Sequence, residues 1–244
     1  MEVGRVSGLK LALVTGGAVR LGEAISRRLA EAGYRVIVHA NSHIERATAL
    51  AEELGGHAFA ADLCDISAID ALFESIDSLD GELAVLVNNA AIFHGADPES
   101  VSLEDWNRQI AINLTAPFRC CQLAAPRIRS AGGGVIINLL DVASMRPEKS
   151  FSHYAATKAG LESLTHGLAV EWAPRIRVNG VAPGVALMPD FYDAAERAEH
   201  LARTPMGEET GAKAIADAVH FLIDGPSALT GVILPVDGGL SSAW

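Results

Sequence analysis

The chain has 244 residues, half of them hydrophobic, and a formal net charge of −11. Nucleic acids and anionic membrane surfaces carry charge of the same sign, so this composition argues against both as partners. A chain of this length can bury a large core, and α/β folds of this size form one domain, which we expect to span 1–244.

Segments with strand character alternate with segments of helical character along the chain. The hydrophobic pattern predicts strands near 9–15, 34–39, 57–61, 83–88, 134–140, 175–180 and 231–236. It predicts helices near 20–32, 43–54, 66–79, 102–130, 152–173 and 211–224. This alternation is typical of βαβ units and predicts a parallel sheet. The charge-rich segment 185–205 interrupts the pattern.

The first predicted strand, Lys10 to Thr15, leads into the turn TGGAVRLG and then into a helix. Strand, turn and helix in this order aim backbone N–H groups and a helix N-terminus at a pyrophosphate. Gly16 permits the tight turn, and Gly22 permits a close approach of the helix to the strand or the cofactor. The segment therefore predicts a dinucleotide site.

Tyr154 and Lys158 are four residues apart on a predicted helix, so they share one of its faces. A free tyrosine has a pKa of about 10, which is too high for efficient proton transfer at neutral pH. Because a nearby ammonium favours the phenolate, we expect Lys158 to lower the pKa of Tyr154. The pair predicts a proton-transfer site.

Motifs spread over nearly the whole chain resemble the short-chain dehydrogenase/reductase family. They are Thr15-Gly16 through Leu21-Gly22, Asn88-Asn89-Ala90-Ala91, Asn113, Tyr154 with Lys158, Pro183-Gly184 and Asp237-Gly238-Gly239. The resemblance implies a single-domain Rossmann fold of class α/β, with a doubly wound parallel seven-stranded sheet and helices on both faces. It also implies a substrate loop near 185–205, and a homotetramer that packs through the helices near 102–130 and 152–173.

The resemblance also implies residue roles. Asn113 joins Tyr154, Lys158 and the residue at position 141 in catalysis, and Tyr154 and Lys158 contact the cofactor as well. The other cofactor contacts that the resemblance implies are Gly16, Arg20, Leu21, Gly22, Asp62, Leu63, Asn89, Ala90, Pro183 and Gly184.

Two departures from the family pattern resemble its pteridine reductase branch. Arg20 replaces the middle glycine of the first turn, and Asp141 stands thirteen residues before Tyr154 (154 − 141), where the family has its catalytic serine. Phe93 matches the aromatic residue that stacks on the pterin ring in that branch, although a core phenylalanine is an equally good interpretation of its position. The branch often has serines at the two preceding positions, which here are Ala91 and Ile92.

Asp141 determines which reaction we expect. Carbonyl reduction develops negative charge on oxygen, which an ionised carboxylate would repel and to which it could donate nothing. A carboxyl group can instead accept hydrogen bonds from the N–H groups of a heterocycle, or relay a proton to a ring nitrogen if burial raises its pKa. We therefore expect reduction of a C=N bond in a pterin or folate ring, with Tyr154, Asp141, Arg20 and Phe93 contacting the substrate. Ser144 could in principle supply the missing hydroxyl.

The end of the second predicted strand indicates the cofactor. NAD-selective sites usually carry an acidic residue there, whereas this chain has His39-Ala40-Asn41-Ser42. His39, Asn41 and Ser42 can donate hydrogen bonds to a 2′-phosphate, so we expect NADPH/NADP+, which the pteridine reductase branch also uses. Asn41 and Ser42 could also simply cap the next helix.

Three functions remain open from the sequence. The first is an NADPH-dependent reductase of biopterin-like or folate-like rings, including dihydrofolate. The second is a carbonyl reductase of the same family, acting on a 3-oxoacyl thioester or a small ketone. The third is a non-enzymatic dinucleotide sensor, which would not require the Tyr154, Lys158 and Asn113 set.

The remaining sequence features are absences. Cys64, Cys120 and Cys121 lack metal-ligand spacing, and the histidines are scattered, so we expect no catalytic metal. The start MEVGRVSG lacks a signal-peptide core, and no uninterrupted apolar stretch has membrane-spanning length. We expect a cytoplasmic protein with a small-molecule substrate and neither nucleic-acid nor membrane partners.

Overall fold

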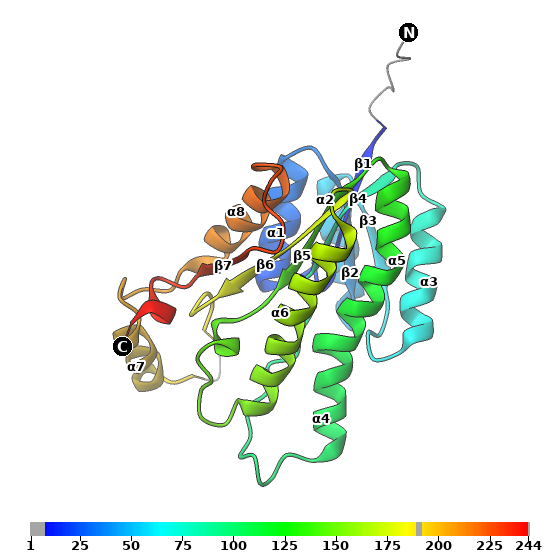
Figure 1. The fold of residues 1–244 in the computed structure, drawn as a ribbon. Coiled ribbons are helices and arrows are strands. Elements are labelled where there is room, and N and C mark those ends of the chain that lie inside the picture. The colour runs from blue at the N-terminus through cyan, green and yellow to red at the C-terminus, as the bar shows by residue number, and fades with distance from the viewer. Residues whose placement is uncertain (1–7, 189–191, 244) are drawn as a thin grey trace.

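Seven parallel strands form one sheet in the order β3-β2-β1-β4-β5-β6-β7 (Figure 1). The computed structural model describes residues 8–188 and 192–243. The strands are β1 (Lys10–Val14), β2 (Arg35–Ala40), β3 (His57–Ala60), β4 (Glu82–Asn88), β5 (Gly134–Leu139), β6 (Ile176–Pro183) and β7 (Ile233–Val236). The strand order reverses between β1 and β4, and ligands of such sheets bind beyond the carboxyl ends of the strands at that point. The predicted parallel, doubly wound architecture is confirmed.

Helices cover both faces of the sheet (Figure 1). One face carries α1 (Arg20–Glu31), α2 (Ile44–Leu54) and α8 (Gly211–Asp224). The other face carries α3 (Ile66–Asp77), α5 (Ala116–Ser130) and α6 (Ser152–Trp172). Short elements complete the fold: α4 (Leu103–Ile110), the π-helical turn η1 (Ala111–Thr115), the 3₁₀ turns η2 (Val142–Ser144) and η3 (Leu240–Ser242), and α7 (Ala194–Arg203).

The two faces of the sheet explain why the strands have nearly continuous hydrophobic sequences. In β1, Val14 packs in the core with α1 and α8, whereas its neighbour Leu13 packs in the core with α3 and α5. Successive side chains of a strand point to opposite faces, and here both faces are covered. Burial of both layers fixes the carboxyl ends of β1, β4, β5 and β6 in place, and the candidate site lies beyond those ends.

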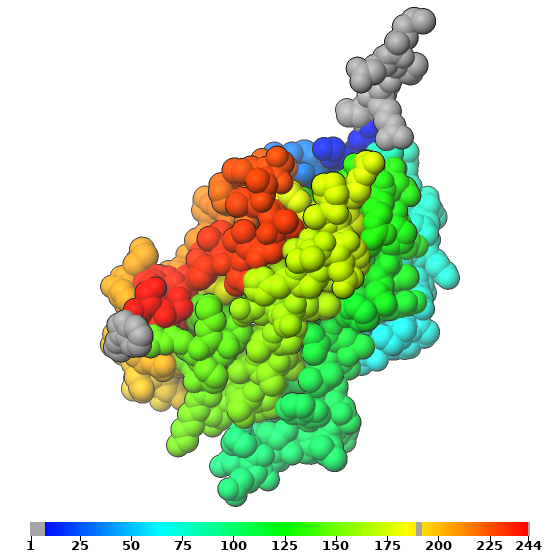
Figure 2. Space-filling view, in the orientation of Figure 1, coloured from blue at the N-terminus to red at the C-terminus, as the bar shows by residue number. Residues whose placement is uncertain are grey.

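The helix predicted near 102–130 is interrupted. α4 ends at Ile110, the π-helical turn η1 follows, and α5 begins at Ala116. Pro117 has no N–H, so the ordinary helical hydrogen bond to the carbonyl of Asn113 cannot form, and the helix widens at this point. α4 and the segment before it project from the lower end of the molecule (Figure 2).

The segment 185–205, expected as a loop, contains the helix α7. Asp193 and Glu196 form a reciprocal capping box at its N-terminus. α7 has no fully buried residue within the described chain, so the hydrophobic pattern did not predict it. Residues 189–191 of the expected substrate loop lie outside the described residues, as do residues 1–7 of the N-terminal segment and Trp244. Among the described helices, none has both the length and the apolar character needed to cross a bilayer.

Candidate active site

A cavity of about 970 Å³ lies beyond the carboxyl ends of the central strands. Its walls come from the Gly-containing turn after β1 and from the segments after β4, β5 and β6, together with α6 and α7. The structure brings many of the expected site residues to this one cavity. They are Arg20, Leu21, Asn89, Phe93, Asp141, Tyr154, Lys158, Pro183 and Gly184.

Tyr154 and Asp141 form a hydrogen-bonded pair in the cavity wall. The Tyr154 hydroxyl donates to Oδ2 of Asp141 at 2.9 Å, while Oδ1 of Asp141 accepts from the backbone N–H of Ala143 at 2.8 Å. The Ala143 bond caps the 3₁₀ turn η2, so one carboxylate oxygen has a structural role and the other faces the phenol. Burial raises the pKa of Asp141, against the opposing effects of the Ala143 bond and the Lys158 charge.

Lys158 is held in place by a hydrogen bond to the sheet. Its Nζ donates to the carbonyl oxygen of Leu139, at the end of β5, at 2.8 Å. The side chain is buried, and this burial lowers the pKa of Lys158 to about 8, against the charge of Asp141. An ammonium has three donors, so one bond to Leu139 leaves others for a ligand.

The structure contradicts the expected lowering of the Tyr154 pKa. Burial raises that pKa well above its ordinary value, and the charge of Asp141 raises it further. The physical reasons are the burial of the phenol and the Asp141 carboxylate, which accepts from the hydroxyl at 2.9 Å; Lys158 Nζ, over the ring at 5.8 Å from its centre, does not offset them. Tyr154 is therefore a neutral phenol whose hydroxyl proton is directed at Asp141.

Asn113 occupies the π-helical turn but does not line the cavity. Its Oδ1 accepts from the N–H of Ile92 at 2.9 Å, and its Nδ2 donates to the carbonyl of Ile92 at 3.0 Å and to Thr157 at 3.3 Å. The side chain thus anchors the segment that follows β4, directly before Phe93. Through this contact Asn113 positions one wall of the cavity.

Ser144 faces away from the reacting groups. Its single O–H has two acceptors within reach, the carbonyl oxygen of Asp141 at 2.9 Å and Oε2 of Glu162 at 2.7 Å. The described residues that line the cavity do not include Ser144. The hydroxyl donor that the sequence left open is therefore not supplied by Ser144.

The turn after β1 has the shape that a pyrophosphate requires. Gly16 has φ +60°, and a Cβ on Gly22 would lie 2.0 Å from the carbonyl oxygen of Gly16, so a side chain at Gly22 would clash with the turn. Asn89 holds the turn through its Nδ2, which donates to the carbonyls of Thr15 and Gly16. Within the described chain no side chain caps α1, whose first N–H groups therefore face an approaching anion. These residues fit a dinucleotide.

His39 is not placed to contact a 2′-phosphate, in contrast to the expectation. The ring is 1% exposed: Nδ1 accepts from the N–H of Gly16 at 3.1 Å, and Nε2 donates to the carbonyl of Ala61 at 3.0 Å. Both ring nitrogens are thus used within the protein, and burial lowers the pKa of His39. His39 is a support for the Gly16 turn.

The other residues expected around the adenosine half lie near the carboxyl ends of β2 and β3. Asn41 and Ser42 are exposed directly after β2, where they remain accessible to a ligand. Asp62 accepts from the N–H of Cys64 through Oδ1, and Leu63 is buried. Ala90, by contrast, follows β4. Its N–H donates to the hydroxyl of Thr15, which places Ala90 beside the Gly-containing turn after β1.

Phe93 and Arg20 flank the mouth of the cavity. The Phe93 ring is 41% exposed, stacks on Phe151 with a centroid distance of 4.4 Å, and meets Tyr154 edge to face at 4.9 Å. Phe93 is thus a partly exposed aromatic wall rather than a core residue. Arg20 has φ +51° and donates from Nη2 to the carbonyl of Leu187 at 2.8 Å, joining the Gly-containing turn to the segment after β6.

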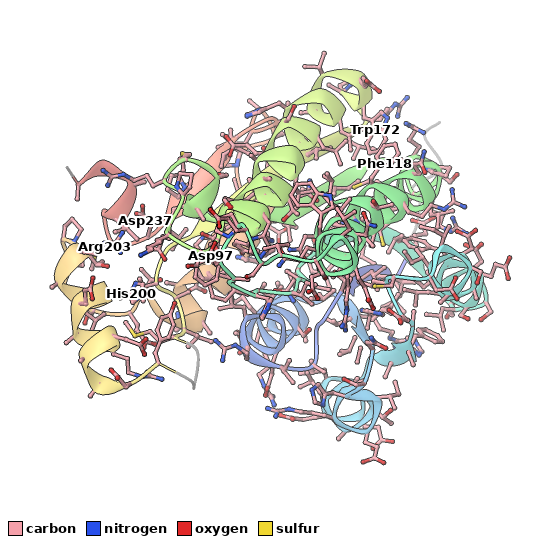
Figure 3. All side chains as sticks on the ribbon, turned by 90° about the horizontal axis from the view of Figure 1, so that it is seen from below. Asp97, Phe118, Trp172, His200, Arg203 and Asp237 are labelled. Atoms are coloured by element: carbon pink, nitrogen blue, oxygen red, sulfur yellow. The ribbon has the colours of Figure 1, made fainter. Side chains whose placement is uncertain are left out.

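Sequence reasoning missed several charged residues of the cavity. Arg146 and Glu148 follow the 3₁₀ turn η2, and His200 and Arg203 lie on α7, which Figure 3 shows at the end of the molecule away from α3. These residues belong to no motif, and because they are far apart along the chain, the sequence gives no indication that they lie close together. Among residues 8–188 and 192–243, no group of three or more His, Cys, Asp or Glu side chains could hold a metal ion.

Comparison with known proteins identifies relatives along nearly the whole chain. A family model described as enoyl-(acyl carrier protein) reductase matches residues 17–241. The 3beta-hydroxysteroid dehydrogenase 1 of Eggerthella lenta is 38% identical over 95% of this chain and 94% of its own. The D-threitol dehydrogenase of Mycolicibacterium smegmatis is 35% identical over 94% and 92%, respectively. The 3-oxoacyl-[acyl-carrier-protein] reductase FabG of Staphylococcus aureus is 36% identical over 95% and 98%.

A solved structure agrees with these relatives. A chain from Sinorhizobium meliloti described as a short-chain alcohol dehydrogenase superposes with a TM-score of 0.89, at 33% sequence identity, and the match covers 98% of both chains.

Proposed function

The chain belongs to the short-chain dehydrogenase/reductase family, and from that premise we propose that it is an NADPH-dependent reductase acting on a C=N bond of a pterin- or folate-type ring. Membership of the family makes it an oxidoreductase that uses a nicotinamide dinucleotide. The family does not determine the substrate, because one fold hosts many chemistries. The substrate has to be argued from the site.

The observation that carries the proposal is the hydrogen bond between Tyr154 and Asp141. In its ionised form Asp141, which accepts from the Tyr154 hydroxyl, would repel an oxygen that is becoming negative. The Tyr154 and Asp141 pair suits a pterin better. The phenol can protonate a ring nitrogen, and the carboxylate can accept hydrogen bonds from the N–H and NH₂ groups of the ring. The raised pKa of Asp141 also lets it pass a proton on to Tyr154.

The other residues take positioning roles. Bound NADPH would supply the hydride from its nicotinamide ring. Lys158, held by Leu139, directs its remaining donors to the ribose hydroxyls and opposes the charge of Asp141. The turn at Gly16 and Gly22 receives the pyrophosphate, and Asn41 and Ser42 donate to the 2′-phosphate. Phe93 provides an aromatic face beside Tyr154 for a planar substrate.

Carbonyl reduction is the second candidate, and the relatives favour it. Their names refer to a sugar alcohol, a hydroxysteroid and a 3-oxoacyl group, and none of the three refers to a pterin. Burial raises the pKa of Asp141, and a protonated Asp141 would donate to a carbonyl oxygen as a hydroxyl does. In this candidate Asp141 takes the donor role alone, because Ser144 is directed elsewhere.

One experiment separates the candidates. NADPH oxidation is measured in parallel with dihydrobiopterin, dihydrofolate and an acetoacetyl thioester, and NADH replaces NADPH in a second series. Turnover of the two pterins with NADPH supports the proposal, whereas turnover of the thioester alone sinks it in favour of carbonyl reduction. NADPH binding without any turnover would indicate a dinucleotide sensor.

The homotetramer and the cytoplasmic location also remain proposals. Leu103 on α4, Phe118 on α5 and Val170 on α6 are large apolar side chains that are exposed in the isolated chain, with Val170 83% exposed. A second copy packed on these helices would cover them. Light scattering after gel filtration measures the assembly, and a monomeric mass would contradict the tetramer.

A further inference from the structure

The outer end of the cavity carries an unusual concentration of positive charge for this chain. The whole sequence has 30 Asp and Glu residues against 19 Lys and Arg residues. Outside the Tyr154, Asp141 and Lys158 group, the charged residues that line the cavity are Arg20, Arg146 and Arg203, with one acidic residue, Glu148, and the lining also includes His200 and Tyr192. Arg20 belongs to the cofactor turn. We call Arg146, His200 and Arg203 the basic rim.

We propose that the basic rim binds an anionic arm of the substrate, a carboxylate or a phosphate, and that Glu148 competes with that arm. This inference rests on the proposed reductase function and specifies its substrate further: the reacting ring carries a negatively charged extension. Arg146 and Arg203 are then specificity-determining residues, and they act on binding rather than on hydride transfer.

The contacts of the rim show that its two guanidinium groups are held in place and only partly neutralised. Arg203 Nη1 lies 3.3 Å from Oε1 of Glu148, and His200 Nδ1 lies 3.9 Å from the same oxygen. Arg146 donates from Nη1 to the carbonyl of Leu240 at 2.7 Å. A guanidinium has five N–H donors, so one carbonyl contact leaves most of those of Arg146 for an incoming anion.

Glu148 resembles the group that the rim would bind. It places a carboxylate against Arg203 and His200 inside the cavity lining, at the place where a substrate carboxylate would sit. The Arg203 side chain is 52% exposed, so this ion pair contributes little to stability and a ligand can displace or share it. Removing the charge of Glu148 should therefore strengthen binding of an anionic arm.

The position of the rim favours the substrate over the cofactor as its ligand. The dinucleotide turn follows β1, and the residues expected at the 2′-phosphate follow β2. Arg146 follows β5, and α7 follows β6, on the other side of β1 in the sheet order. The cavity of about 970 Å³ is lined by expected cofactor residues such as Leu21 and Gly184 as well as by the rim, so the rim belongs to the part of the cavity that the dinucleotide turn does not form.

The test compares matched substrates with and without a charged arm. Dihydrofolate, with its glutamyl carboxylates, and dihydroneopterin phosphate represent the two sources of charge, and dihydrobiopterin lacks both. The measured quantity is the ratio of kcat/KM for each charged substrate to kcat/KM for dihydrobiopterin. We expect Arg203→Gln and Arg146→Gln each to lower the ratio about fivefold, which corresponds to the upper range for a partly exposed ion pair. The charged substrate whose ratio falls identifies the arm.

Glu148→Gln is the decisive variant because it should change the ratio in the opposite direction. The amide keeps an oxygen that can accept from Arg203 but removes the competing charge, so we expect the ratio to rise about twofold to fivefold. A general disturbance of the cavity wall would instead lower the ratio in Glu148→Gln as well. Lys213→Gln, at an exposed position on α8, is the matched control and should leave the ratio unchanged.

Outcomes for the function and for the rim are separable. No turnover of any pterin overturns the proposed function, and the rim is then measured with acetoacetyl coenzyme A against ethyl acetoacetate, a charged and a neutral carbonyl substrate. Folic acid binding, followed by tryptophan fluorescence, gives a readout that does not depend on turnover. Ratios and affinities that stay unchanged in Arg203→Gln and Arg146→Gln, or that fall in Glu148→Gln, overturn the inference.

Discussion

The Tyr154 hydroxyl donates a 2.9 Å hydrogen bond to Oδ2 of Asp141, thirteen residues earlier in the chain (154 − 141). Tyr154 lies on α6 and Asp141 precedes the 3₁₀ turn after β5, so the pair joins two elements across the cavity wall. Because the two groups interact strongly, their protons are properties of the pair. The pair keeps Tyr154 protonated, which is the state that the proposed proton donor requires.

Replacement of Tyr154 by phenylalanine tests its role as the acid. We expect turnover to fall by about a hundredfold or more, the range of a lost general acid. The dissociation constant of NADPH should stay nearly the same, since the ring remains in its aromatic contacts with Phe93 and Phe151. Stopped-flow NADPH oxidation and fluorescence titration measure the two quantities. Activity close to that of the native protein would require another proton donor.

Asp141→Ser restores the residue type that the family resemblance implies at this position. If the substrate is a pterin, we expect turnover to fall by about a hundredfold, because the serine cannot accept from the ring N–H groups as a carboxylate does. Turnover of a ketone or thioester should be unchanged or higher, since a hydroxyl now donates to the carbonyl oxygen. Steady-state rates with both substrate classes give the answer. Unchanged pterin reduction would remove the argument from Asp141.

His39→Ala tests the supporting role assigned to the buried histidine. The N–H of Gly16 and the carbonyl of Ala61 would both lose their partner, at a cost of roughly 1–3 kcal/mol for each buried group left unsatisfied. We expect a lower Tm and a weaker affinity for NADPH and NADH alike. Ser42→Ala should weaken NADPH alone. If His39→Ala weakened the binding of NADPH but not that of NADH, the result would instead indicate that His39 contacts the 2′-phosphate.

The buried Lys158 makes stability depend on pH. Burial lowers its folded-state pKa to about 8 from the ordinary 10.5 of a lysine. Between these values the unfolded chain binds the proton more readily, so the free energy of unfolding rises as pH increases from about 8 to 10.5. The full gain is about 3 kcal/mol. Urea unfolding of the native protein and Lys158→Met at pH 7 and at pH 9.5 isolates this contribution, and a parallel pH dependence in the two proteins would contradict it.

The sequence predicted the sheet well because each strand can be recognised from the residues of that strand alone. Strand segments buried on both faces are continuous hydrophobic runs, and the turn at Gly16 and Gly22 follows directly from the backbone geometry a pyrophosphate requires. The π-helical turn at Asn113 escaped prediction because it depends on Pro117 within an otherwise regular helical pattern. The helix α7 escaped because its signal is the capping box of Asp193 and Glu196 rather than a buried face.

The sequence by itself determined the architecture, the dinucleotide turn and the spacing of Tyr154 and Lys158, since each depends on residues that are close along the chain. Tertiary structure alone decided that a carboxylate rather than an ammonium is the charge nearest the Tyr154 hydroxyl and that His39 turns inward. It also decided that Glu148 meets Arg203 at the cavity. These relationships join the carboxyl ends of different strands, and only the packing of the sheet and helices sets the distances between them.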